Sequence, residues 1–206
     1  MQDVADRKAI MLTGILLAGG RSRRMGRDKA LLELGGETVA RRLLRVLREC
    51  AEELIIVGNA PERFEREDVP VIPDDAPGLG VVGGIATGIR AMRGETGIVI
   101  ACDMPFLSGD LLRFVAASVG DADGALIESE KGYEPLCAAY RKTLLPTLDR
   151  MIAEGDLAAQ RIVERGNLRV LDVAELECAG FDRRRLFNMN TPEDWETARR
   201  LLSELA

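Results

Sequence analysis

The sequence predicts an α/β domain whose central sheet is mostly parallel. Apolar runs of strand length alternate along the chain with segments of helical periodicity, and the runs lack the in-out alternation of a half-exposed strand. Alternating elements of this kind build a parallel-rich sheet with helices on both faces. At 206 residues and 47% hydrophobic, with no linker or internal repeat, the chain is expected to form a single domain over residues 1–206.

The individual elements follow from composition and capping signals. In the first half, short apolar runs predict strands at 15–18, 54–57, 71–72 and 97–101, and helical spacing predicts helices at 38–50, 84–92 and 111–119. Thr38 and Ser108 are the expected N-caps. In the second half we expect strands at 124–128, 134–140 and 168–173, and helices at 142–154, 157–165 and from Pro192, which takes the first helical position behind Thr191.

A glycine- and arginine-rich segment directly follows the first strand. Gly19–Gly20 lets backbone N–H groups approach an anion without a Cβ in the way. Residues 21–29 hold five cations and one anion, a local charge of +4 in a chain of net charge -6. We expect a phosphate chain to bind there. The alternative is a flexible arginine-rich surface loop.

The spacing excludes two common phosphate loops. A Walker loop needs Gly-Lys-Ser/Thr, but Gly26 is followed by Arg27, and Lys29 by Ala30. The dinucleotide fingerprint G-x-G-x-x-G is absent as well, so Rossmann-type cofactor binding is disfavoured.

The segment ACDMP, residues 101–105, places a carboxylate just after the strand at 97–101. Ligands of such sheets bind at the carboxyl ends of the strands, so the loops after residues 18, 57, 72 and 101 should converge. Asp103 is therefore a candidate ligand for magnesium, which one or two carboxylates and substrate phosphates usually hold. The alternative is an Asp that only caps the turn.

Composition removes several classes of function. The chain has no histidine, which excludes Ser-His-Asp hydrolysis and the H-E-x-x-H metalloproteases. Its four cysteines stand far apart, which favours reduced, core-filling thiols in the cytoplasm. Acidic net charge and 4% aromatic residues argue against a nucleic-acid partner. The apolar run at 10–20 is too short to span a membrane, and we expect neither a membrane segment nor export.

Four motifs in order resemble one known family. LAGGRSRRMGRDK at 17–29 is similar to the L-A-[GA]-G-x-x-x-R-M-G-x-x-K signature of nucleotidyltransferases with a Rossmann-like domain. VIPDD with GLGVVGG, ACDMP, and FNMNTPEDW follow in the same order, up to residue 195. With LAGG rather than LAAG, the chain most resembles the molybdenum cofactor guanylyltransferases. This resemblance implies a three-layer, nucleotide-diphospho-sugar-transferase-like Rossmann-type fold, with residues 12–120 binding nucleotide and 121–206 the acceptor.

The resemblance also implies roles for single residues. Arg24, Lys29 and Asp103 would be catalytic, with Mg²⁺ on Asp103. Asn188 and Asn190 would lie near a pterin acceptor. The nucleotide would be bound by Leu17, Ala18, Gly19, Gly20, Lys29, Asp74 and Asp103.

Asp74 and the glycines after it carry further expectations. A solvated Asp74–Asp75 turn is the alternative to a nucleotide contact at Asp74. Glycines at 78, 80, 83 and 84 predict a loop whose backbone can approach a base and that ends at a helix N-terminus. The family often has Asn directly after the second strand, whereas this chain has Gly58 and then Asn59, which leaves that contact open.

The activity that the resemblance implies is transfer of GMP from GTP to the phosphate of molybdenum-molybdopterin, with pyrophosphate as the second product. Molybdoenzyme maturation proteins are a further implied class of partner. A cytidylyltransferase on the same pterin, or a related sugar-phosphate nucleotidyltransferase, would share the phosphate contacts. A non-catalytic nucleotide-binding module for cofactor delivery would keep the glycines and could dispense with Asp103.

Overall fold

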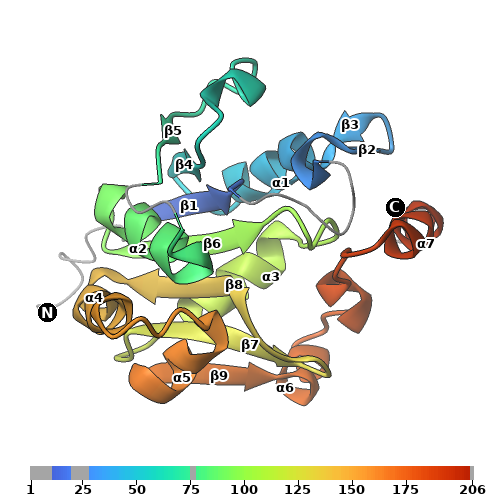
Figure 1. The fold of residues 1–206 in the computed structure, drawn as a ribbon. Helices are drawn as coiled ribbons and strands as arrows, with labels where there is room; N and C mark the ends of the chain where they lie inside the picture. The colour runs from blue at the N-terminus through green and yellow to red at the C-terminus, as the bar shows by residue number, and fades with distance from the viewer. Residues whose placement is uncertain (1–10, 20–27, 75–77, 205–206) are drawn as a thin grey trace, which may run out of the picture.

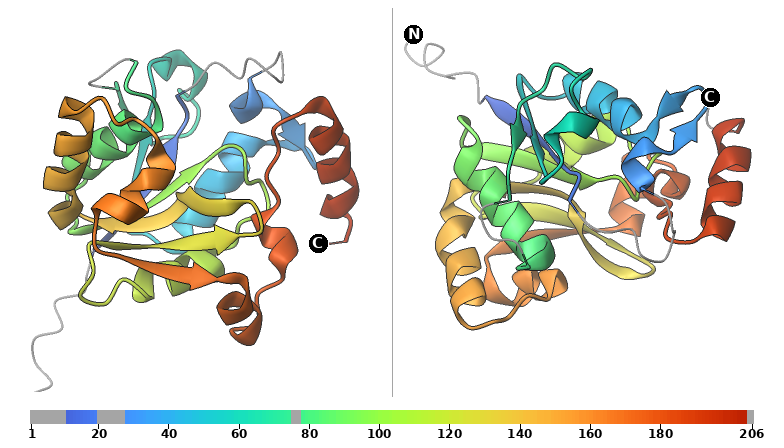
Figure 2. Two further views of the ribbon diagram at one scale, coloured as in Figure 1. Left: turned by 60° about the horizontal axis from the view of Figure 1, so that its bottom comes forward. Right: turned by 45° about the horizontal axis from the view of Figure 1, so that its top comes forward.

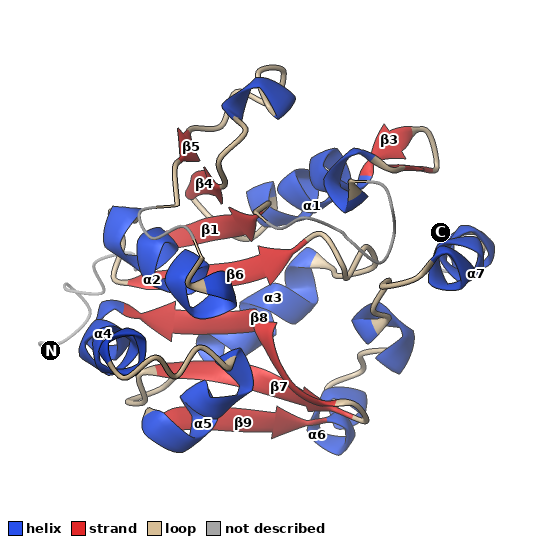
Figure 3. Ribbon diagram, viewed as in Figure 1, coloured by secondary structure: helices blue, strands red, loops and turns tan. Residues whose placement is uncertain are grey.

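A seven-stranded sheet forms the centre of the protein (Figure 1). The computed structural model describes residues 11–19, 28–74 and 78–204. The strand order is β5-β4-β1-β6-β8-β7-β9, and only β8 runs antiparallel to its neighbours, as the arrows in Figure 3 show. The expected mostly parallel sheet is thus confirmed. In this order the strands are Val71–Ile72, Glu53–Val57, Leu12–Leu17, Thr96–Ala101, Gly132–Arg141, Gly124–Ser129 and Leu168–Asp172.

Helices cover both faces of the sheet and complete three layers (Figure 2). One core cluster joins the sheet to α1, Val39–Arg48, α3, Gly109–Ala117, α6, Val173–Cys178, and α7, Pro192–Leu202. The other joins it to α2, Gly80–Ala91, α4, Leu145–Ala153, and α5, Ile162–Arg165. Strand β1 feeds both clusters, with Leu16 in the first and Ile15 in the second, which is why its apolar residues do not alternate.

The three expected caps are confirmed. The side chains of Thr38, Ser108 and Thr191 each accept a hydrogen bond from the backbone N–H of the third residue after them. At α7 the cap is reciprocal, because the Asp194 carboxylate accepts the Thr191 N–H at 2.9 Å. These caps fix where α1, α3 and α7 begin.

The expected glycine loop at 78–84 is wrong in its second half. Helix α2 begins at Gly80 rather than near residue 84, so Gly83 and Gly84 are buried in its first turns. The missing side chains let the helix pack closely on β1. A Cβ at Gly88 would lie 2.7 Å from Ile15 Cγ2, and one at Gly84 3.4 Å from Leu17 Cδ1. Gly88 therefore serves close packing of the helix on the sheet, whereas a Cβ at Gly84 would make only an ordinary contact with Leu17.

Other departures lie mainly in the second half. The helix expected at 157–165 is a 3₁₀ turn, η4, Ala159–Arg161, followed by the four residues of α5. Helix α6 was not expected; Asp172 starts it with a reciprocal cap to Glu175. It leaves Cys178 exposed, contrary to the core role expected of all cysteines, whereas Cys50, Cys102 and Cys137 are buried.

Two small elements and the C-terminal helix close the fold beside α1. A 3₁₀ turn, η1, Lys29–Leu31, precedes the β2–β3 hairpin, whose strands are Glu33–Leu34 and Glu37–Thr38. Helix α7 lies against this hairpin, with Leu202 over Gly35 (Figures 1 and 2). The C-terminal segment is thereby carried back to the N-terminal half. None of the helices described here is long and apolar enough to cross a membrane.

Candidate active site

A cleft of about 200 Å³ opens at the carboxyl ends of β1 and β6. The parallel pairing of these two strands, from Leu12 opposite Thr96 to Leu17 opposite Ala101, brings the residues that follow them side by side. The end of β4 backs onto the same place, since a Cβ at Gly58 would lie 3.5 Å from the carbonyl carbon of Ala18. The lining residues are Leu17, Ala18, Gly19, Asp28, Lys29, Ala30, Ala101, Cys102, Asp103 and Leu136.

Asp103 contributes a buried carboxylate oxygen to this cleft. Its Oδ1 is covered and makes no hydrogen bond to any of the described residues. Burial raises the pKa of Asp103, while the Lys29 ammonium and the backbone N–H of Asp103 itself lower it. A buried acceptor without a donor is costly unless a ligand completes it. Asp103 is therefore more than a turn cap.

Lys29 enters the cleft from η1. Its Nζ donates to Asn190 Oδ1 at 2.7 Å, and Asn190 Nδ2 donates to Asn188 Oδ1 at 2.7 Å. A chain of polar contacts thus links the end of the glycine- and arginine-rich segment to the FNMN motif. The two expected acceptor asparagines and the expected phosphate lysine lie together, although 161 residues separate Lys29 from Asn190.

The FNMN motif is docked directly on the loop of Asp103. The Met189 N–H donates to the Asp103 carbonyl at 2.7 Å, and the Met189 side chain is buried in the core. The Asp194 carboxylate accepts the Asn190 N–H at 2.8 Å, which holds the motif at the start of α7. Capping and burial therefore hold Asn190 against Lys29, with Asn188 behind it.

Asp74 lies in the neighbouring loop, after β5, and does not line the cleft. Its N–H donates to Asn59 Oδ1 at 2.9 Å, and its carboxylate accepts a hydrogen bond from Thr87 of α2 at 3.4 Å. Asn59 thus joins the loops that follow β4 and β5, which is a structural use for the shifted asparagine. Asp74 is consequently more than part of a solvated turn.

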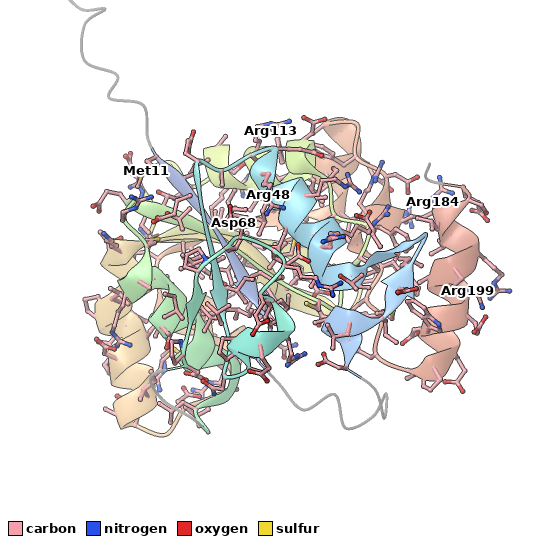
Figure 4. All side chains as sticks on the ribbon, turned by 90° about the horizontal axis from the view of Figure 1, so that it is seen from above. Met11, Arg48, Asp68, Arg113, Arg184 and Arg199 are labelled. Atoms are coloured by element: carbon pink, nitrogen blue, oxygen red, sulfur yellow. The ribbon has the colours of Figure 1, made fainter. Side chains whose placement is uncertain are left out.

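Three residues singled out in the sequence, Gly20, Arg24 and Asp75, lie outside the described residues. Among the arginines at 183–185, Arg183 and Arg184 form exposed ion pairs, whereas Arg185 donates to the Phe106 carbonyl at 3.4 Å. The arginines labelled in Figure 4, Arg48, Arg113, Arg184 and Arg199, are all exposed.

Sequence reasoning missed three charged residues near the cleft. Arg63 forms an ion pair with Asp28, and Arg42 of α1 donates from Nε to the Pro105 carbonyl at 3.0 Å. Glu134 of β8 accepts from Ser129 at 2.7 Å; burial, chiefly, and the nearby Asp103 raise its pKa. Register could have placed Glu134, because β8 pairs with β6 up to Ile100 opposite Cys137. No local pattern indicated Arg63 or Arg42.

The cleft fits a divalent cation bound together with phosphates. Within the described part of the chain, no group of three carboxylate or thiol side chains could hold a metal alone. A carboxylate with one unpartnered oxygen, Asp103 Oδ1, suits a hard cation such as Mg²⁺, which keeps waters and phosphate oxygens as its other ligands. Cys102 is unsuited to catalysis, since burial raises its pKa to about 12.

Comparisons with known proteins agree with this geometry. Residues 14–170 match the family model of the MobA-like NTP transferase domain. A probable molybdenum cofactor guanylyltransferase of Opitutus terrae is 36% identical over 93% of this chain and 96% of its own. The crystal structure of molybdopterin-guanine dinucleotide biosynthesis protein A from Archaeoglobus fulgidus has a TM-score of 0.80 and 25% identity, covering 93% of this chain and 99% of its own. A Mycobacterium tuberculosis protein solved with manganese, 22% identical over 92% of this chain and 98% of its own, has the same fold at a TM-score of 0.64.

The three-layer fold and the cleft at the ends of β1 and β6 define a nucleotidyltransferase. More particularly, the chain belongs to the MobA-like family whose curated relatives are named molybdenum cofactor guanylyltransferases.

Proposed function

We propose that this chain transfers GMP from GTP to the terminal phosphate of molybdenum-molybdopterin, giving molybdopterin guanine dinucleotide and pyrophosphate. The observation that carries the proposal is the joint position of Lys29 and the unpartnered Asp103 in one cleft, in a chain of this family. Nucleotidyl transfer requires a positively charged side chain that contacts the triphosphate. It also requires a carboxylate that holds a divalent metal beside the same triphosphate.

The nucleotide would enter at the carboxyl ends of the parallel strands. The backbone of Leu17 to Gly20 would follow the phosphates, with Arg24 and Lys29 supplying positive charge. Asp74, held by Asn59 and Thr87, would contact the nucleoside from the neighbouring loop. The N-terminus of α2 lies after that loop and adds a favourable field for anions.

Asp103 would hold Mg²⁺, and the bound cation would supply charge neutralisation on the phosphate oxygens. The protein's own groups perform the rest. An oxygen of the acceptor phosphate forms a bond to the α-phosphorus of GTP, the bond between the α-phosphorus and the bridging oxygen breaks, and pyrophosphate leaves toward Lys29. A phosphate monoester is largely ionised near neutral pH, so positioning and electrostatics suffice without a general base.

Asn188 and Asn190 would orient the acceptor. Each side-chain amide can both donate and accept, as a pterin edge demands. The hydrogen bond from Lys29 to Asn190 supports this role, because it joins a proposed acceptor residue to the proposed phosphate-binding lysine. The donor and acceptor phosphates would meet at that junction. Holding the two reacting groups side by side in this way would itself accelerate the transfer.

A nucleotide competition series tests the choice of base. The protein with Mg²⁺, molybdenum-molybdopterin and α-labelled GTP should form labelled dinucleotide, and unlabelled GTP should compete far better than CTP, ATP or UTP. Stronger competition by CTP would identify a cytidylyltransferase on the same acceptor. Turnover only with a sugar phosphate would move the chain to the sugar-phosphate enzymes.

Substitution of Asp103 separates an enzyme from a binding module. Asp103→Ala should retain nucleotide binding measured without metal and lose turnover by roughly 10²-fold or more. Asp110→Ala removes an exposed carboxylate on α3 and serves as the matched control, with unchanged turnover. A wild-type protein that binds GTP yet transfers nothing to any acceptor would support the delivery module instead.

A further inference from the structure

Asp28 places a negatively charged side chain in the wall of the cleft that is proposed to bind a triphosphate. Asp28 directly precedes Lys29 and lines the cleft with it. One of its oxygens, Oδ1, accepts the Ala30 N–H at 3.1 Å and caps η1. A full negative charge at this position opposes the binding of a polyphosphate unless another group offsets it.

Arg63 is the group that meets this charge. It stands at the end of the 3₁₀ turn η2, Pro61–Arg63, which follows β4, and Nη2 pairs with Asp28 Oδ2. The pair is largely covered, with 22% of the Arg63 side chain and 35% of the Asp28 side chain exposed. The next residue, Phe64, is 3% exposed and anchors η2 in the core. The burial of Phe64 therefore holds η2, and with it the Arg63 guanidinium, beside Asp28.

The charge of Arg63 reaches the floor of the cleft. The pKa of Cys102 is raised by burial and by Asp103, and is lowered by the positive charges of Arg63 and Lys29. Cys102 lines the cleft together with Lys29 and with Asp28, the partner of Arg63. Arg63 Nε is buried and finds no hydrogen-bond acceptor among the described residues, and the ion pair with Asp28 is the contact through which the guanidinium meets the cleft wall.

We propose that Arg63 is a positioning residue for the nucleotide, which it serves by neutralising Asp28 and by fixing the segment that carries Lys29. This inference rests on the proposed function, since it presumes that a nucleoside triphosphate occupies the cleft. Arg63 acts through Asp28 and does not itself touch the substrate. The ion pair also ties the loop after β4 to the start of η1.

A double-substitution cycle read by calorimetric GTP binding tests the proposal. Arg63→Gln should weaken GTP binding roughly five- to tenfold, because it leaves the negative charge of Asp28 unpaired beside the phosphates. Asp28→Asn keeps an oxygen that can cap η1 and removes the charge, so Arg63→Gln in that background should cost less than about twofold. Arg66→Gln, which removes an exposed cation three residues further on, is the matched control and should bind as the wild type does.

A comparison of guanine nucleotides with three, two and one phosphates distinguishes an electrostatic effect of Arg63→Gln from a general loss of structure. The loss caused by Arg63→Gln should be largest for GTP, smaller for GDP and smallest for GMP, and in turnover it should appear in KM for GTP more than in kcat. Arg63→Lys should restore part of the affinity because it keeps the charge. Should Arg63→Gln fail to fold, Arg63→Lys and the double variant carry the same comparison.

Two outcomes overturn the proposal while leaving the proposed function intact. They are an Arg63→Gln protein that binds GTP as tightly as the wild type, and one that loses the same affinity with and without Asp28→Asn. A wild-type protein that binds no GTP at all overturns both, so the two failures are distinguishable.

Discussion

The Lys29 ammonium donates to Asn190 Oδ1 at 2.7 Å and so joins the segment after β1 to the segment before α7. Lys29 follows the glycine- and arginine-rich segment after β1, and Asn190 precedes α7. A second hydrogen bond, from the Met189 N–H to the Asp103 carbonyl at 2.7 Å, joins the segment before α7 to the loop after β6. A residue proposed to hold donor phosphate is thereby placed beside one proposed to hold acceptor.

This junction predicts coupled effects on turnover. Lys29→Ala should lower kcat/KM for GTP by roughly 10²- to 10³-fold because it removes a cation from the phosphates. Asn190→Ala should raise KM for the acceptor. The double variant should lose less than the product of the two single effects, because the residues share one hydrogen bond. Steady-state kinetics with each substrate varied in turn would measure this.

Lys142→Ala is the control for the loss of a lysine, since Lys142 pairs with Glu95 at the far end of the sheet. Independent, fully multiplicative losses for Lys29 and Asn190 would contradict the coupling.

The stability of the ligand-free protein should rise when Asp103 loses its charge. Burial raises the pKa of Asp103 above the ordinary 3.8. A raised folded-state pKa contributes stability that is present below the unfolded-state pKa and is lost as the pH rises through the folded-state value. Near pH 7, Asp103→Asn should therefore raise the free energy of unfolding by about 1–3 kcal/mol, and the variant should melt at a higher temperature than the wild type.

The difference should shrink as the pH is lowered through the raised pKa of Asp103, because the wild-type carboxyl then takes up its proton. Mn²⁺ or Mg²⁺ should stabilise the wild type and leave Asp103→Asn unchanged. Thermal melting across pH, with and without metal, gives both results. Equal metal stabilisation of the two proteins would show that Asp103 does not hold the cation.

The loop that carries Asp103 should depend on Arg42. Its guanidinium Nε donates to the Pro105 carbonyl at 3.0 Å, and desolvation by burial lowers its pKa, only partly offset by Glu37. Arg42→Met keeps the aliphatic packing and removes this bond, so we expect kcat to fall about three- to tenfold with little change in fold. Arg41→Met, at an exposed position paired with Glu67, is the neighbouring control. Equal kinetics for both variants would rule out the positioning of Pro105 by Arg42.

Two glycines of α2 should respond to alanine in opposite directions. Gly88→Ala places a Cβ 2.7 Å from Ile15 Cγ2 and should destabilise the protein by about 1–3 kcal/mol through overpacking. Gly84→Ala meets Leu17 Cδ1 at an ordinary 3.4 Å and should be neutral or gain up to about 1 kcal/mol of helix propensity. Chemical unfolding measures both, and a destabilised Gly84→Ala beside a neutral Gly88→Ala would contradict the packing.

The sheet and most of its helices could be predicted because their signals are local. Apolar runs such as 97–101 have no alternation when both faces are covered, and Thr38, Ser108 and Thr191 mark helix starts wherever the chain folds. The position of α2 was harder to predict. Gly83 and Gly84 look like loop residues in sequence, and only the structure shows that they lie inside a helix that packs on β1, most closely at Gly88.

The site divides in the same way. Asp103 was predictable because a carboxylate follows a buried strand, and the FNMN asparagines because of the family resemblance. The contact of Asn190 with Lys29 depends on α7 returning to the β2–β3 hairpin, which no local pattern encodes. Arg63 and Arg42 act through contacts with Asp28 and Pro105 that are distant in sequence.

A crystal structure with GTP and Mn²⁺ tests the central claim most directly, since the anomalous signal locates the metal without assumption. The account predicts one Mn²⁺ bound to an Asp103 carboxylate oxygen and to phosphate oxygens of a single GTP whose triphosphate also contacts Lys29 Nζ. Manganese bound away from Asp103, or a triphosphate that cannot reach both Asp103-bound metal and Lys29, would contradict it.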